Sequence, residues 1–268
     1  MTKFRSVAGK EIPPIGLGCM SLSQAYLPLP SEVEAETLVH RALDIGYTHL
    51  DTARLYGLGH NERLLSRILE TRRSEVFLAS KCGIEFEDGT RRIDCRPETI
   101  RRAVEKSLTT LRTDYIELYY LHRRDFDTPI EESVGTLADL KAEGKIGAIG
   151  LSEMSADTVR AAHKEHPIAA VQSEYSLWTR NPELGVLDAC QTLGISFVAF
   201  SPVARGALAG SLQDPSKLKP KDLRVNHPRF TEPHWRQNHA LIEKFNQIAA
   251  NNGITPAQLS LSWVLTQG

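Results

Sequence analysis

The feature that most constrains the fold is a regular alternation of short apolar runs with amphipathic stretches. Seven runs have the length and apolar content of buried β-strands, at 15–19, 48–51, 76–81, 115–121, 146–151, 169–171 and 195–200. Helical periodicity fills the intervals at 31–44, 61–69, 97–111, 130–143, 156–163 and 183–192. Strands that alternate with helices predict an α/β fold with parallel pairing and right-handed crossovers.

Start and stop signals agree with this periodicity. Ser31 and Glu34 have the spacing of a capping box, Pro97 suits a first helical turn, and glycines stand where helices should end, at 46, 144 and 194. A hairpin around Ala8-Gly9 is expected before the first β/α unit, and two helices at 234–251 and 255–266 after the last. The irregular stretch 203–233 is expected to be a lid or partly disordered.

The residues at the strand ends favour a barrel over an open sheet. An open dinucleotide-binding sheet should carry a Gly-rich loop after its first strand, but the segment at 16–19 lacks the third glycine and opens no helix. Polar or aromatic residues instead follow six successive strands, namely Asp51, Lys81, His122, Ser152, Gln172 and Phe200-Ser201. A barrel gathers function on one such rim, so we expect a parallel β/α barrel.

Composition excludes several other classes of protein. Of 268 residues, 41% are hydrophobic and 24% charged, which indicates one folded domain over 1–268. A net charge of −1 offers no field for nucleic acid, and no stretch approaches the roughly 20 apolar residues of a membrane span. The four cysteines lack metal-site or disulfide spacing. We therefore expect a cytoplasmic protein without metal, nucleic-acid or membrane partners; its oligomeric state is left open.

Four residues could together reduce a carbonyl group. Taken singly, each has an ordinary explanation: Asp51 could cap a helix, Tyr56 and Lys81 could be exposed, and His122 could belong to the core. Hydride reduction needs a proton donor for the developing alkoxide, and a phenol with a pKa of about 10 needs tuning for that task. Lys81 would depress the pKa of Tyr56, Asp51 would hold Lys81, and His122 would orient the carbonyl oxygen.

With these residues in view, the chain resembles the aldo-keto reductases. The resemblance is carried by the hairpin and Gly16-Leu17-Gly18, then by DTARLYG, LASK, LYYLHRRD, GLSE, VQSEYSLWTR and SPVARG, which occur in the family order over essentially the whole chain. The SLWTR stretch at 176–180 looks most like the plant auxin-induced and related bacterial branch.

The resemblance implies a (β/α)8 TIM barrel with an N-terminal hairpin. It also implies reduction of aldehydes or ketones by NADPH, with Asp51, Tyr56, Lys81 and His122 as catalytic tetrad and Tyr56 as proton donor. Ser152 and Gln172 would hold the nicotinamide carboxamide, Phe200 would stack under its ring, and the loop 201–208 would wrap the pyrophosphate. The full set implied to bind cofactor is Gly18, Cys19, Met20, Ser152, Gln172, Phe200, Ser201, Val203, Gly206 and Leu208. Loops with Tyr26, Leu27, Trp178 and Trp235 are expected to wall the substrate pocket.

Two departures from the family pattern stand out. Many members carry Asn where this chain has Glu153, and a carboxylate cannot donate to an amide oxygen. After LSWVLTQG the family continues with an eighth strand and the residues that grip the 2′-phosphate, so we expect a C-terminally incomplete barrel, with NADP over NAD preference left open. The alternatives are a non-catalytic nucleotide-binding subunit of the same fold and, more remotely, a barrel hydrolase that uses Asp51.

Overall fold

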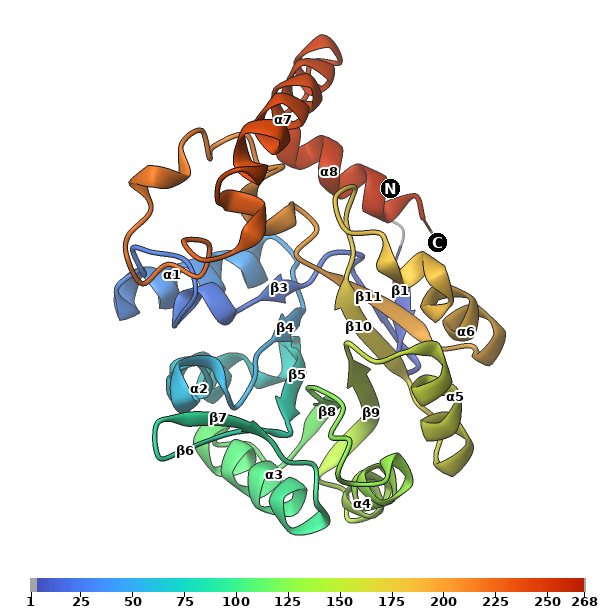
Figure 1. Ribbon diagram of the computed structural model, residues 1–268. Helices are drawn as coiled ribbons and strands as arrows, with labels where there is room; N and C mark the ends of the chain where they lie inside the picture. Colours follow the sequence, from blue (N-terminus) through green and yellow to red (C-terminus); the bar gives the residue numbers. More distant parts are fainter. Residues whose placement is uncertain (1–3, 268) are drawn as a thin grey trace. The chain divides into compact units, whose positions relative to one another are not determined.

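The computed structural model describes residues 4–267, shown as a ribbon in Figure 1. It divides into two compact units, which we describe separately. Unit 1 comprises Met1–Gln24, Pro30–Ser173 and Gly185–Val198, and unit 2 comprises Ala25–Leu29, Glu174–Leu184 and Ala199–Gly268. None of the helices in residues 4–267 is long and apolar enough to cross a membrane.

A seven-stranded sheet forms the framework of unit 1. Its strands follow one another in chain order, and the pairings from β3 to β10 are parallel, as the alternation of strands and helices predicts. The strands are β3 (Leu17–Gly18), β4 (His49–Asp51), β5 (Phe77–Cys82), β8 (Ile116–Leu121), β9 (Ile146–Ser152), β10 (Ala170–Glu174) and β11 (Ser196–Phe200). This is the expected α/β barrel, with seven strands in the described residues rather than eight.

Helices cover the outside of the sheet in Figure 1. They are α1 (Glu32–Asp44), α2 (His60–Arg72), α3 (Pro97–Leu111), α4 (Ile130–Ala142), α5 (Ala156–Glu165) and α6 (Val186–Leu193). The predicted capping box is present, because Ser31 Oγ accepts from the Glu34 backbone while the Glu34 carboxylate accepts from the Ser31 backbone.

One prediction about local structure was wrong, and one element was not predicted. The single helix expected over 183–192 is a short 3-10 turn, Asn181–Leu184, followed by α6, because Gly185 at φ 144° cannot continue a helix. An additional hairpin, β6 (Ile84–Glu87) and β7 (Thr90–Ile93), stands outside the main sheet. Its turn residues Asp88 and Gly89 both have positive φ, as a tight hairpin turn requires.

The sheet of unit 1 separates two apolar layers. Strand residues on one face, such as Leu78, Tyr119 and Ile149, pack in the large cluster with helix residues such as Leu65 and Val104. On the other face, alternate strand residues form a smaller cluster with the N-terminal hairpin of β1 (Arg5–Val7) and β2 (Lys10–Ile12). Its members are Val7, Ile12, Phe77, Ala79, Leu118, Tyr120, Ala148 and Ala170. The hairpin thus supplies Val7 and Ile12 to the interior of the barrel.

Unit 2 contains the predicted final helices, α7 (His234–Asn251) and α8 (Pro256–Leu265). The stretch 203–233 consists of short 3-10 turns with a cluster of its own, in which Phe230 packs with Trp178, Trp235 and Leu208. This stretch is tied to 25–29, since Asp222 Oδ2 accepts from Leu27 N at 2.9 Å and Ala25 O accepts from Leu223 N at 2.8 Å. The structure therefore shows an anchored segment where partial disorder was one of two expectations.

Candidate active site

Three neighbouring parallel strands carry the predicted tetrad to one edge of the sheet. Asp51 is the last residue of β4, Lys81 lies at the end of β5, and His122 directly follows β8. Tyr56 stands in the loop between β4 and α2, at the start of a short 3-10 turn. Parallel strands end at the same edge of a sheet, so the residues that follow these strands in the sequence lie near one another in the structure, as predicted.

Lys81 is the centre of the cluster. Its Nζ donates to Asp51 Oδ1, to the Thr52 carbonyl oxygen at 2.9 Å and to Tyr56 Oη at 3.3 Å. The Lys81 side chain is 0% exposed and that of Asp51 14% exposed, so this is a buried ion pair whose charges need their partners. Burial alone would lower the pKa of Lys81, but Asp51 and Tyr56 outweigh it and hold that pKa above its usual value. Lys81 is thus a fixed ammonium group.

Gln172 donates a hydrogen bond to the second carboxylate oxygen of Asp51. Its Nε2 donates to Asp51 Oδ2 at 2.8 Å, across the barrel from β10. Each carboxylate oxygen of Asp51 therefore has a side-chain donor, and the carboxylate is held from two sides.

Tyr56 has a pKa above the ordinary value of a phenol. Burial raises the pKa most, and the nearby Lys81 ammonium lowers it. As expected, Lys81 contributes to lowering the pKa of Tyr56. Burial outweighs this contribution, so the expectation that the pKa as a whole would be lowered was wrong. Tyr56 is consequently protonated at neutral pH and can donate a hydrogen bond or a proton.

His122 presents a neutral imidazole beside the phenol. Its ring lies edge-on to Tyr56 with centroids 6.0 Å apart, and its backbone N–H donates to Cys82 O at 2.8 Å. Burial lowers the pKa of His122 well below its usual value, and the Lys81 and Arg123 cations lower it further. A neutral imidazole keeps one N–H donor, which can bind a carbonyl oxygen.

Two residues under the tetrad were missed by sequence reasoning. Tyr120 is fully buried with its ring centroid 5.8 Å from Lys81 Nζ, and a Cβ on Gly150 would lie 2.3 Å from Tyr120 Cδ1. The Tyr120 ring therefore occupies the space that a side chain at position 150 would need. Glycine inside a strand is the signal that could have revealed this close approach, and β9 has glycine at both 147 and 150.

The predicted nicotinamide-binding residues of unit 1 surround the Asp51 strand end. Gly18 pairs with Asp51 in the sheet, Cys19 N donates to Asp51 O at 2.8 Å, and Met20 begins the following 3-10 turn. Ser152 is buried and pairs with Gln172 across β9 and β10. Glu153, at φ 56°, directs its backbone N–H to Gln172 O at 2.9 Å.

The remaining predicted cofactor residues belong to unit 2, on the loop that follows β11. Phe200 ends the strand; Ser201, Val203, Gly206 and Leu208 follow it. Ala204 and Arg205 are left-handed (φ 52° and 59°), and the backbone N–H groups of Ala204, Gly206 and Leu208 donate to the carbonyl oxygens of Ser201 and Val203, so the loop forms a compact turn. Arg205 and Arg229 of this unit both pair with the Glu174 carboxylate, and each also has at least one buried guanidinium nitrogen without a hydrogen-bond partner. One carboxylate between two guanidinium groups leaves a net positive charge, which fits the phosphates of a dinucleotide.

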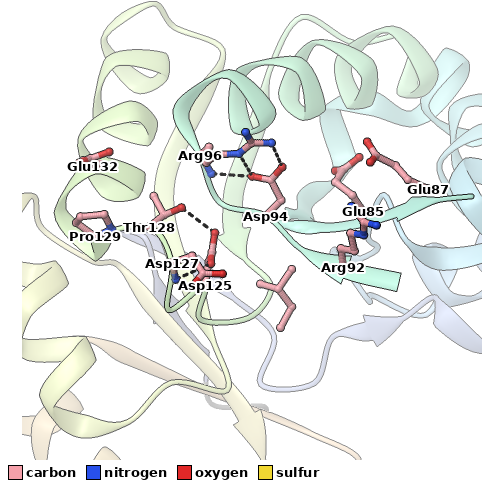
Figure 2. A pocket seen from close by; sticks show the side chains of 11 residues that line it. Glu85, Glu87, Arg92, Asp94, Arg96, Asp125, Asp127, Thr128, Pro129 and Glu132 are labelled. Atoms are coloured by element: carbon pink, nitrogen blue, oxygen red, sulfur yellow. Dashed lines mark hydrogen bonds and ion pairs between the residues drawn. The ribbon is translucent and has the colours of Figure 1, made fainter. Parts of the chain in front are cut away.

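A separate surface pocket of about 470 Å³ lies at β6, β7 and the start of α4 (Figure 2). Its lining is mostly acidic, and Figure 2 shows Asp94 bound to Arg96 and Asp125 bound to Thr128. None of the tetrad lines it. Across residues 4–267, no group of three or more His, Cys, Asp or Glu side chains could hold a metal ion, in this pocket or elsewhere.

Comparison with known proteins places these features in a family. The model of the aldo/keto reductase family matches residues 14–268. The aldo-keto reductase yakc [NADP(+)] of Schizosaccharomyces pombe is 41% identical over 271 residues, which cover 98% of this chain and 79% of the relative. A probable aldo-keto reductase 1 of Glycine max is 41% identical, over 97% of this chain and 75% of the relative.

Solved structures agree with the sequence relatives. Glycerol dehydrogenase AKR11B4 from Gluconobacter oxydans superposes with a TM-score of 0.90 at 30% identity, over 100% of this chain and 84% of that one. An aldo/keto reductase from Klebsiella pneumoniae in complex with NADP and acetate gives a TM-score of 0.72 at 27% identity, over 98% of this chain and 81% of that one.

Proposed function

The chain belongs to the aldo/keto reductase family, and within the NADP-dependent carbonyl reduction of that family we propose that Tyr56 is the proton donor. The observation that carries the proposal is the Lys81 ammonium, which binds both the Asp51 carboxylate and, at 3.3 Å, Tyr56 Oη. A second phenol, Tyr175 after β10, shares the Glu183 carboxylate with Arg180, but there the phenol donates to the carboxylate.

Each member of the tetrad then has a distinct task. Tyr56 gives its proton to the carbonyl oxygen of an aldehyde or ketone, and Lys81 stabilises the phenolate that remains. Asp51 keeps Lys81 charged and in place. His122, neutral and buried, donates to the carbonyl oxygen and orients it toward Tyr56. NADPH, when bound, supplies the hydride that the carbonyl carbon accepts.

We propose that the cofactor is held by the residues that sequence reasoning assigned. Ser152 and Gln172 would bind the carboxamide, and because Gln172 Nε2 already donates to Asp51, its Oε1 is the atom left to accept from the amide. Gly18, Cys19 and Met20 would flank the ring and Phe200 would stack under it. Ser201, Val203, Gly206 and Leu208 would hold the pyrophosphate through their loop backbone. Glu153 is not assigned a contact.

The test is Tyr56→Phe, which removes only the hydroxyl. We expect kcat for a panel of aldehydes to fall roughly 10²- to 10⁴-fold, the range typical of a general acid, while the NADPH Kd measured by fluorescence stays unchanged. Tyr47→Phe, which alters a tyrosine outside the tetrad, is the control and should retain full turnover. If Tyr56→Phe turns over like the wild type, Tyr56 is not the acid.

Three broader proposals accompany this mechanism. Residues 1–268 would act as one aldo-keto reductase-type domain, which a single calorimetric unfolding transition would test; the family match over 14–268 supports it. The substrate would be a small carbonyl compound. The protein would work in the cytoplasm, as its four free cysteine thiols suggest, and cell fractionation would check this. The enzyme assignment leaves no ground for the alternative of a non-catalytic subunit.

A further inference from the structure

We propose that Glu62 is a positioning residue for Tyr56. Through Arg54 and Ser80, Glu62 would fix the loop that carries the phenol against the strand that carries Lys81. The inference rests on the proposed function, because it concerns how the proton donor is held beside its partner.

Glu62 is an acidic side chain in an unusual place. It lies in the first turn of α2, its side chain is 0% exposed, and it faces β5. Glu62 Oε1 accepts from Ser80 Oγ at 2.8 Å, and Glu62 Oε2 lies 3.6 Å from Arg54 Nη1 without a hydrogen bond of its own. A carboxyl group is costly to bury, so its presence here calls for an explanation beyond packing.

Besides Ser107 of α3, Glu62 has two partners that are near neighbours of the reacting pair. Ser80 precedes Lys81 in β5 and points to the opposite face of the strand. Arg54 lies two residues before Tyr56, and its backbone N–H donates to Lys81 O at 3.3 Å. Glu62 therefore connects, through one atom on each side, the two segments whose separation sets the contact between Tyr56 Oη and Lys81 Nζ.

The loop leaves room for this connection. Gly59 has φ 89°, and a Cβ at that position would lie 2.6 Å from Arg54 Nη1. The residue next to Glu62 holds the other end of the loop: Asn61 Oδ1 accepts from Thr52 Oγ1 at 2.6 Å, and Asn61 Nδ2 donates to Cys19 O at 2.8 Å. The first turn of α2 thus contacts the loop both at Thr52, through Asn61, and at Arg54, through Glu62.

The carboxyl group of Glu62, whose pKa is raised by burial, can be replaced with little change in shape by Glu62→Gln. Glu117→Gln is the matched control. Glu117 is also buried, pairs with Arg73 at 2.9 Å and accepts from the backbone N–H of Leu78 in β5 at 3.0 Å. Glu117 differs from Glu62 in that it lies near the other end of the strands. Both variants should lose similar thermal stability. We expect kcat for 4-nitrobenzaldehyde to fall about ten- to hundredfold in Glu62→Gln only, the effect of a misplaced catalytic group, with an unchanged NADPH Kd.

A double-mutant cycle separates positioning from general damage. In the Tyr56→Phe background, Glu62→Gln should cause no further loss of kcat, because the group it positions is gone. Arg54→Lys, which keeps the cation, should retain most of the activity, whereas Arg54→Met should resemble Glu62→Gln.

The outcomes are distinguishable. An equal loss of kcat in Glu62→Gln and Glu117→Gln, or the same fold-loss with and without the Tyr56 hydroxyl, overturns the positioning role while leaving the proposed function intact. Wild-type turnover in Tyr56→Phe overturns the proposed function and this inference with it.

Discussion

Gly150→Ala tests whether the space between β8 and β9 sets the position of Lys81. A Cβ at residue 150 would lie 2.3 Å from Tyr120 Cδ1 and 2.4 Å from Tyr120 Cε1, against 3.4 Å for ordinary contact. The ring or the strand must therefore move by about 1.1 Å, the difference between 3.4 and 2.3 Å. Tyr120 is 0% exposed and its strand is paired on both sides, so neither can yield freely.

Overpacking of this kind costs about 1–3 kcal/mol. At about 2–4 °C per kcal/mol for a chain of this size, Tm measured by calorimetry should fall by roughly 2–12 °C. Because Lys81 Nζ lies 5.8 Å from the Tyr120 ring centroid, the displaced ring should also shift Lys81 and lower kcat about tenfold or more.

Gly135→Ala in α4 is the matched control, since its Cβ would meet Glu165 Oε1 at an ordinary 3.6 Å and alanine favours a helix. Tm should stay level or rise there, with unchanged kcat. Tyr120→Leu should restore part of the stability of Gly150→Ala by removing the ring. A Gly150→Ala enzyme with wild-type Tm and kcat would refute the reasoning.

Two further predictions concern the buried charges. Asp51→Asn leaves the Lys81 ammonium without its carboxylate, so the free energy of unfolding measured in urea should fall by about 3–5 kcal/mol. Adding Lys81→Met should restore part of this loss. A loss below about 1 kcal/mol would contradict the buried ion pair. The pKa of His122 in the folded protein lies well below its unfolded value of about 6.5. Below that pH the unfolded chain therefore binds more protons than the folded protein. The free energy of unfolding of the wild type should fall by up to about 1.4 kcal/mol per pH unit on acidification. His122→Asn should lose stability less steeply over the same range, and parallel curves for the two proteins would count against a depressed pKa.

The positions of the strands and of the four side chains of the proposed tetrad could be predicted because both follow from local pattern. Buried strands such as Ile116–Leu121 are nearly continuous apolar runs, and the residue after each run must lie at the common edge of a parallel sheet. The hairpin β6–β7 escaped prediction because both strands are mostly exposed, the apolar–polar alternation of IEFE covers only four residues, and TRRI has a single apolar residue. Its Asp88-Gly89 turn carried the clearer signal.

Features that depend on packing between distant residues could not be predicted. Gly150 and Tyr120 are 30 positions apart, and only the register of β8 against β9 brings the ring over the glycine. The same holds for Glu62, which reads as an exposed residue in the first turn of an amphipathic helix until Ser80 and Arg54 are found beside it.

The direction of the pKa shift of Tyr56 changes how its acidity must be understood. Sequence reasoning assigned Lys81 the task of making the phenol a stronger acid at rest, yet burial makes it a weaker one in the free protein. A weak resting acid keeps its proton at neutral pH, which is the state that donation requires. The stabilisation by Lys81 grows once the phenolate forms, because the ammonium then faces a full negative charge at a site sheltered from water. In the mechanism we propose, Lys81 would therefore act mainly on the transition state, and its contacts with Asp51 and Thr52, together with the Gln172 contact to Asp51, would hold it in position.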